Sequence, residues 1–239
     1  GYDLGMNTPG GFGEFITVPE GWIVKKPENL SALEAMSIGT AGITAAASVI
    51  KIIDSKPSSE LPIMVTGATG GVGSVAVMIL SKLGFDVSAL TGKPEAKNFL
   101  TQLGANSIIL REDYLNEPSK PMVRPLFAGA VDTVGGSILS KLLSEIAPHG
   151  VVSCCGNVGG IEINTTVFPF ILRGINLCGI DSAESPIEFK ESLWKKFANE
   201  WRLDLSASTK EVFKEQLGEE IQIILQGGQQ GRVVLNHKE

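Results

Sequence analysis

The chain has 239 residues, enough for two domains, and its 43% hydrophobic and 19% charged content supports a buried core and excludes a disordered protein. Its formal net charge of −6 argues against nucleic-acid and anionic-membrane partners, because both favour a basic surface. Three cysteines and two histidines, without a CxxC pair, predict neither a disulfide framework nor a zinc site, and they indicate a reducing, cytoplasmic setting.

Two further absences bear on the location of the protein. We expect no membrane span, because no run approaches about 18 apolar residues. The first residues show neither the basic region nor the apolar region of a secretion signal, so secretion is not indicated.

The first 36 residues contain a glycine-rich stretch, 10–19, that is typical of β structure rather than of alternating strands and helices. The segment is too short to form a core alone. We therefore expect it to belong to a second domain whose beginning is absent from this chain, or to pack directly on a sheet. An apolar helix is predicted to open at 39–45.

Between Pro62 and Ile180, short apolar runs alternate with segments of helical period. Strands are predicted at 63–66, 87–90, 107–110, 130–132, 151–154 and 176–180. Helices are predicted at 74–83, 94–103 and 138–146, and the proline-rich stretch 114–125 is expected to be a loop. This alternation predicts a doubly wound parallel α/β sheet with helices on both faces. Beyond residue 183 we expect two helices, 186–201 and 208–225, and a short strand, 232–235.

The strongest local motif is the glycine loop Val65–Gly73, VTGATGGVG, which lies between a predicted strand and a predicted helix. Glycines at these positions allow a sharp turn, bring bare N–H groups to a pyrophosphate and let the helix pack closely on the strand. The helix N-terminus adds a partial positive charge. In this context the motif predicts a dinucleotide site. The alternative is a flexible turn without a ligand.

The end of the second strand distinguishes the cofactors. An NAD site places a carboxylate there to hold the ribose 2′-hydroxyl. This sequence instead has Thr91, Gly92 and Lys93, and the nearest acid, Asp86, lies at the other end of the strand. Thr91 can donate a hydrogen bond to a 2′-phosphate and Lys93 can neutralise it, so NADPH is favoured. The alternative for Lys93 is a solvated loop lysine.

Three more small-residue segments are expected beside this cleft: 39–45, 132–136 and 155–160. The last two leave the carboxyl ends of predicted strands, which is the edge where open α/β sheets bind ligands. A single glycine in such a place is best explained as a chain turn. Three loops at one edge favour a binding cleft.

Taken together, several motifs are similar to those of the zinc-free medium-chain dehydrogenase/reductases, in the quinone-oxidoreductase branch. They are GTAG (39–42), VTGATGGVG (65–73), LGA (103–105), DTVG (132–135) and PFILRG (169–174). With GIDS (179–182) and QGRVV (230–234), the chain most resembles the acrylyl-coenzyme A reductase subgroup. The resemblance runs along nearly the whole chain.

The resemblance implies a Rossmann domain at 37–182 that interrupts a GroES-like, β-rich catalytic domain, of which 1–36 and 183–239 are remnants. It implies NADPH-dependent hydride transfer to an activated alkene such as acrylyl-coenzyme A, without zinc. Quinone or 2-alkenal reduction and a catalytically silent NADPH-binding fragment remain alternatives. No proton donor is identified.

The site residues follow from the motifs and their positions in this family. Thr44, Cys155, Gly156 and Asn157 are expected near the nicotinamide, and Arg173 and Arg232 are candidates for cofactor or coenzyme A phosphates, with surface or salt-bridged arginines as the alternative. The strand at 176–180 resembles the edge strand through which such reductases form homodimers. The remaining expected cofactor-binding residues are Gly67, Thr69, Gly70, Gly71, Val72, Thr91, Gly92, Lys93, Thr133 and Val134.

Overall fold

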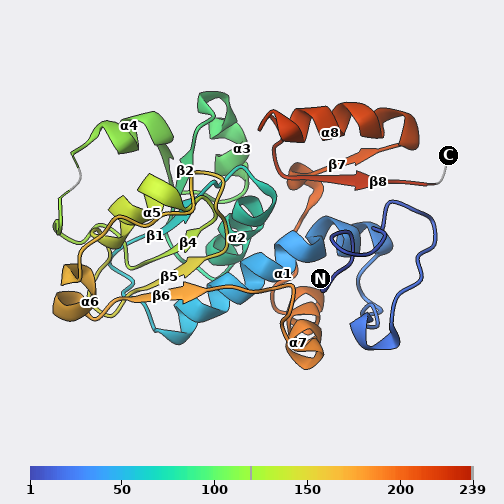
Figure 1. The fold of residues 1–239 in the computed structure, drawn as a ribbon, viewed down its shortest axis with the longest axis horizontal. Helices are drawn as coiled ribbons and strands as arrows, with labels where there is room; N and C mark the ends of the chain where they lie inside the picture. The colour runs from blue at the N-terminus through green and yellow to red at the C-terminus, as the bar shows by residue number, and fades with distance from the viewer. Residues whose placement is uncertain (119, 238–239) are drawn as a thin grey trace.

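A computed structural model describes residues 1–118 and 120–237 of the chain. Its centre is a six-stranded parallel sheet in the order β3-β2-β1-β4-β5-β6 (Figure 1). The strands are β1 Ile63–Thr66, β2 Val87–Thr91, β3 Ser107–Leu110, β4 Gly129–Asp132, β5 Val151–Cys154 and β6 Asn176–Gly179. All six predicted strands and the doubly wound sheet are thus confirmed. The order reverses between β1 and β4, which places the ligand-binding crevice at the carboxyl ends of these strands.

Helices cover both faces of the sheet, as the alternation of side chains along each strand requires. Ile63 and Val65 of β1 belong to a core that includes residues of α1 and α2, whereas Met64 belongs to the opposite core with residues of α4 and α5. The helices in and around the sheet are α1 Ala32–Asp54, α2 Gly71–Lys82, α3 Lys97–Gln102, α4 Arg111–Asn116, α5 Gly136–Leu143 and α6 Phe168–Arg173.

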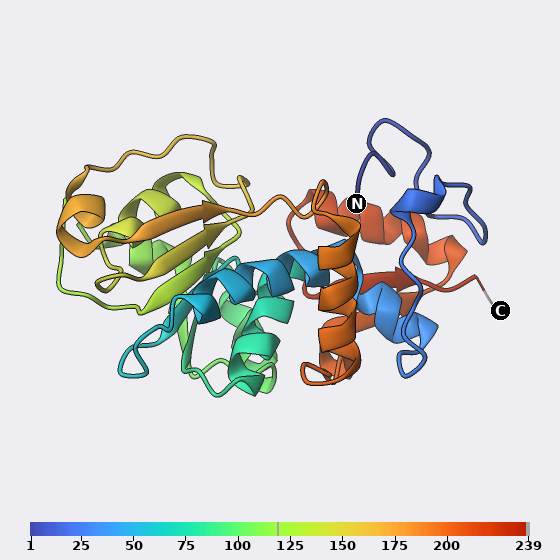
Figure 2. The same cartoon turned by 90° about the horizontal axis from the view of Figure 1, so that it is seen from below.

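The remaining elements form a second lobe beside the carboxyl ends of the strands. It contains α7 Ile187–Ala198, β7 Thr209–Val212, α8 Leu217–Leu225 and β8 Arg232–Leu235. In Figures 1 and 2 the first 30 residues lie in this lobe, near the start of α1. Strands β7 and β8 pair in parallel, separately from the large sheet.

Three predicted segments differ in the structure. The expected β structure in 10–19 is wrong: the segment has no strand, and Phe12 and Phe15 are exposed. An alternating sequence becomes a strand only where a neighbouring strand supplies hydrogen bonds, and here none is adjacent. The predicted helix 208–225 begins only at Leu217, because Thr209–Val212 pairs with β8. The predicted loop from Tyr114 starts within α4, and Ser119 in that loop lies outside the described residues, as do Lys238 and Glu239.

Helix α1 is long and apolar enough to cross a membrane, with a mean hydropathy of 1.6 over its best window. The expectation that no segment approaches this length is therefore wrong. In the fold, 61% of that window is buried, and the helix packs against α2 and β5. Such burial is typical of the core helix of a folded domain.

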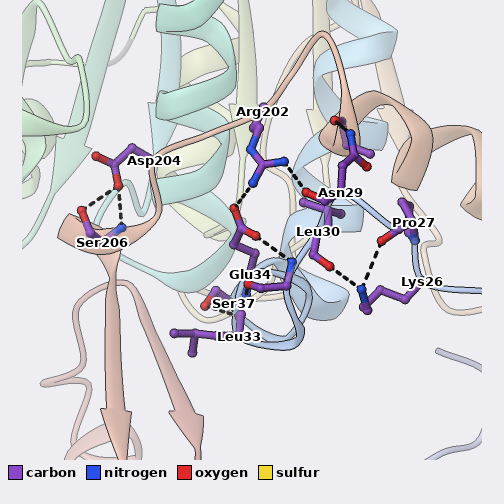
Figure 3. A network of polar contacts seen from close by, with 12 residues as sticks. Lys26, Pro27, Asn29, Leu30, Leu33, Glu34, Ser37, Arg202, Asp204 and Ser206 are labelled. Atoms are coloured by element: carbon purple, nitrogen blue, oxygen red, sulfur yellow. Dashed lines mark hydrogen bonds and ion pairs between the residues drawn. The ribbon is translucent and has the colours of Figure 1, made fainter.

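The amino-terminal end of α1 is fixed by a network of polar contacts (Figure 3). Ser31 and Glu34 form a capping box, in which each side chain accepts a hydrogen bond from the other residue's backbone N–H. Arg202, beyond the end of α7, donates to Glu34 Oε1 at 2.6 Å and to the carbonyl oxygen of Asn29. The network ties the start of α1 to the second lobe.

Gly39 interrupts α1 with φ 48° and ψ −158°, so the segment at 39–45 does open a new run of helix, as predicted. The break exposes the carbonyl of Ser37, which accepts a hydrogen bond of 3.0 Å from Nε of Arg232 at the start of β8. A second link joins the lobes nearby: the N–H of Gly231 donates to the carbonyl of Thr69 in the glycine loop at 2.9 Å. The second lobe is therefore attached at the glycine loop itself.

Replacement of Gly231 by alanine is expected to destabilise the protein. Gly231 has φ +61°, and an added Cβ would overlap the carbonyl oxygen of Ser208. Strain and overlap together are expected to lower the free energy of unfolding by roughly 2 kcal/mol or more in urea titrations. Gly218→Ala, in α8 with open space around its Cβ position, is the control and should be neutral or stabilising by about 0.5–1 kcal/mol. Equal stabilities of the two variants would contradict this account.

Candidate dinucleotide-binding site

The glycine loop runs from the end of β1 to the first turn of α2, and its backbone is packed too closely for side chains. Gly67 has φ +58°, and a Cβ there would overlap Oγ1 of Thr133. A Cβ on Gly73 would overlap the carbonyl oxygen of Gly67, and the N–H of Gly70 donates to that same oxygen at 2.9 Å. These contacts explain why the positions are glycines, and they leave the first N–H groups of α2 accessible to an anion.

A cleft of about 850 Å³ opens over this loop. It lies at the carboxyl ends of β1, β2 and β4, and the second lobe forms one wall. Of the expected cofactor residues, the structure brings eleven to this cleft: Gly67, Thr69, Gly70, Gly71, Val72, Thr91, Gly92, Lys93, Thr133, Val134 and Arg232.

At the end of β2, Thr91 is buried and its Oγ1 accepts the N–H of Lys93 at 3.1 Å. The ammonium of Lys93 donates to the carbonyl of Gln229 in the second lobe. Lys93 is half-buried, and this burial lowers its pKa, although the nearby Glu95 opposes the shift. The alternative of a fully solvated loop lysine does not fit these contacts.

Arg232 lies between the break in α1 and the first turn of α2. Its Nη1 is 2.8 Å from the Cβ position of Gly71, and its Nη2 is 3.0 Å from that of Gly39. Burial lowers the pKa of the guanidinium. Within the described residues, no carboxylate forms an ion pair with Arg232. A half-buried cation beside a helix N-terminus, without a counterion, is suited to binding a phosphate.

The loop after β4 is held in place by a buried carboxylate. Asp132 accepts hydrogen bonds from Oγ1 of Thr66 at 2.7 Å and from the N–H of Gly135 at 2.9 Å. Burial raises the pKa of Asp132, and these hydrogen bonds oppose the shift. Thr133 in turn donates from Oγ1 to the carbonyl of Thr66 at 2.8 Å. Asp132 thus positions the cleft wall formed by Thr133 and Val134.

The four residues expected near the nicotinamide do not line this cleft. Thr44 is buried, and its hydroxyl contacts Oγ of Ser182 at 2.6 Å. Cys155 donates from Sγ to the carbonyl of Asp132, and burial raises its pKa to about 11, so the thiol is neutral near pH 7. Gly156 packs on the backbone of Thr133, and Asn157 is exposed in the same turn. Cys155 and Gly156 thus pack against the backbone of Asp132 and Thr133, behind the cleft wall.

Arg173 has a different surrounding from the one predicted. Its guanidinium is buried and donates to the carbonyls of Ser144 at 3.0 Å, Ile146 at 2.8 Å and Val123. It does not line the cleft. These contacts give Arg173 a structural function, that of holding the chain after α5.

Several cleft residues were not predicted, and two groups of them matter most for the site. Arg111 directly follows the predicted strand 107–110, and its place at a strand's carboxyl end was a usable signal. The turn after α8 had no such signal, because it reaches the cleft only through the packing of the second lobe. The cleft-lining residues of this part of the chain are Ile224, at the end of α8, and Gln226, Gly227, Gln229 and Gly231 after it.

The family model described as zinc-binding dehydrogenase matches residues 71–199. Quinone oxidoreductase YhfP of Bacillus subtilis is 44% identical, and the match covers 98% of this chain and 72% of YhfP. Acrylyl-CoA reductase AcuI of Ruegeria pomeroyi is 38% identical, and the match covers 99% of this chain and 72% of AcuI. The chain belongs to the medium-chain dehydrogenase/reductase family. It is thus a member of an oxidoreductase family and spans about 72% of the length of these relatives.

Solved structures agree with this assignment. The yhdH oxidoreductase of Salmonella enterica in complex with NADP superposes with a TM-score of 0.94 and 37% identity, covering 100% of this chain and 74% of that chain. The yhfP protein of Bacillus subtilis, with NAD bound, also gives 0.94, at 43% identity, covering 99% and 73%.

The family model is described as zinc-binding, but the described residues do not provide a zinc site. In residues 1–118 and 120–237, no three His, Cys, Asp or Glu side chains gather in a way that could hold a metal ion. The donor set described here therefore does not fit zinc, and no chemical step is assigned to a metal.

Proposed function

We propose that the chain binds NADPH in the cleft over the glycine loop, and that it is the cofactor-binding part of a reductase acting on an activated alkene such as acrylyl-coenzyme A. The observation that carries the proposal is the cleft itself: bare glycine backbone at the start of α2, with the unpaired Arg232 beside it and Lys93 at the end of β2. The identities to an acrylyl-CoA reductase and to an NADP-bound oxidoreductase support it.

Different residues of the cleft would bind different groups of NADPH. The N–H groups at the start of α2, with Arg232, would hold the pyrophosphate, and Thr91 and Lys93 would hold the ribose 2′-phosphate. Asp132 keeps the loop carrying Thr133 and Val134 against the other side of the cofactor. When bound, NADPH supplies a hydride. The cleft residues would orient NADPH for the reaction. Such orientation accounts for a large share of many enzymatic rate enhancements.

Charge reversal at Lys93 tests the cofactor assignment. Lys93→Glu replaces the proposed phosphate ligand by a repelling carboxylate, so NADPH binding is expected to weaken by about 100-fold, which corresponds to roughly 2.7 kcal/mol. NADH binding should change little or improve. Fluorescence titration of both nucleotides measures the ratio, and Lys97→Glu, exposed and outside the cleft, is the control. Wild-type protein without a preference for NADPH would contradict the assignment.

A substrate panel tests the reaction. The full-length enzyme, supplied with NADPH, is expected to reduce acrylyl-coenzyme A with a higher kcat/KM than quinones or 2-alkenals. The second candidate, a quinone reductase, is favoured by the 44% identity to quinone oxidoreductase YhfP, and preferential turnover of quinones would establish it. Tight NADPH binding without turnover of any acceptor would instead identify a silent nucleotide-binding protein.

We also propose a homodimer formed through β6. This strand is an edge of the sheet, and exposed apolar side chains of Val167, Ile171 and Leu172 lie on or beside the preceding α6. The N–H groups of Asn176 and Ile180 bond toward β5, so by alternation that of Gly179 faces outward.

The outward N–H of Gly179 allows the dimer to be tested. Gly179→Pro removes one donor from the free edge without breaking the ladder to β5, and proline is tolerated at such positions. Light scattering coupled to size-exclusion chromatography should show a dimer for the wild type and for the control Gly179→Ala. A smaller dimer fraction is expected for Gly179→Pro. A monomeric wild type would refute the proposal.

A further inference from the structure

Arg111 occupies the outer end of the cleft, at the carboxyl end of β3, and lines it together with Thr91, Gly92 and Lys93. A Cβ built on Gly92 would lie 2.8 Å from Cζ of Arg111, 2.9 Å from Nη2 and 3.1 Å from Nε. Three nearly equal distances mean that the guanidinium presents its flat face to Gly92. Its edge N–H groups therefore point along the cleft surface rather than into the backbone.

The donors of Arg111 are not engaged elsewhere in the described part of the chain. The side chain is exposed and forms no ion pair or hydrogen bond there, even though Glu112 and Asp113 follow it directly. Lys93 differs, because its ammonium already donates to the carbonyl of Gln229. At this end of the cleft, Arg111 thus offers a planar set of donors while Lys93 is partly committed to the second lobe.

We propose that Arg111 is a specificity-determining residue that binds the 2′-phosphate of NADPH through its edge N–H groups. This inference rests on the proposed binding of NADPH in the cleft. A guanidinium can donate two parallel hydrogen bonds to a phosphate, a geometry that the ammonium of a lysine cannot match. Because NADH carries a hydroxyl at the same position, Arg111 contributes little to its binding. Gly92 is small enough to let the guanidinium lie there.

A different contact would have a different signature. The face of Arg111 could instead stack on the adenine, with Leu115 on the cleft wall nearby. Adenine is common to both nucleotides, so loss of a stacking contact would weaken NADPH and NADH equally. Loss of a 2′-phosphate contact weakens NADPH alone. The two nucleotides therefore separate the two contacts.

The experiment compares Arg111→Ala, Arg111→Lys and the control Arg124→Ala, which removes an exposed arginine outside the cleft. Affinities for NADPH and NADH are measured by fluorescence titration, and those for 2′,5′-ADP and 5′-AMP by calorimetry. Arg111→Ala is expected to weaken NADPH and 2′,5′-ADP by about 10- to 100-fold, in line with one lost charge-assisted contact. NADH and 5′-AMP should stay within about twofold, and Arg111→Lys should recover part of the loss. The salt dependence of NADPH binding should also become shallower in Arg111→Ala.

A second variant displaces the arginine without removing it. In Gly92→Ala the three atoms nearest the new Cβ all belong to the end of the flexible Arg111 side chain, so the fold should be unaffected while the NADPH preference falls. Equal losses for both nucleotides in Arg111→Ala, or no loss in either, would overturn the assignment and leave the proposed function intact. If the wild type binds neither nucleotide, the proposed function itself fails.

Discussion

The position of Arg232 is the constraint around which the cleft is organised. Its guanidinium lies beside the N-terminus of α2, where the helix dipole disfavours a cation by about 0.3–1 kcal/mol, and the described residues give it no carboxylate. It keeps one hydrogen bond, to the carbonyl that the break at Gly39 leaves free. The folded protein thus holds two positive features together. The repulsion lowers the stability of the ligand-free protein. A bound phosphate would remove the repulsion and restore that stability.

The sheet could be predicted from the sequence because its signals are local. Each strand is a short apolar run, and each helix shows its own period, so all six strands were found within one residue at either end. The glycine loop was equally accessible, since its contacts join residues only a few positions apart, as in Gly67 and Gly73. Ten of the predicted cleft residues followed from that loop and the strand ends, and Arg232 followed from the family resemblance.

The sequence predictions are wrong where the local structure depends on residues that are distant in the chain. Thr209–Val212 becomes a strand only because β8 lies beside it, and 10–19 does not because no strand does. Arg173 shows the same limit for a side chain. Its place in a family motif suggested a phosphate ligand, but carbonyls of two separate segments, Ser144 and Ile146 after α5 and Val123 before β4, surround its guanidinium. Nothing in the sequence around Arg173 specifies those segments. The turn containing Gln229 is similar, because it reaches the cleft only through the packing of the second lobe.

The link between the lobes also bears on how the cofactor is chosen. NADP is bound in the yhdH structure and NAD in the yhfP structure, although both superpose equally well on this chain. The overall fold is therefore compatible with either nucleotide, and in the proposed site the side chains at the ends of β2 and β3 would distinguish them. In this chain, one of those side chains, Lys93, is bonded to the second lobe, which is also attached through Gly231 and Arg232. A nucleotide whose phosphate binds Lys93 would compete with the hydrogen bond from Lys93 to Gln229. The proposed cofactor site therefore includes residues of both lobes and is not confined to residues 37–182.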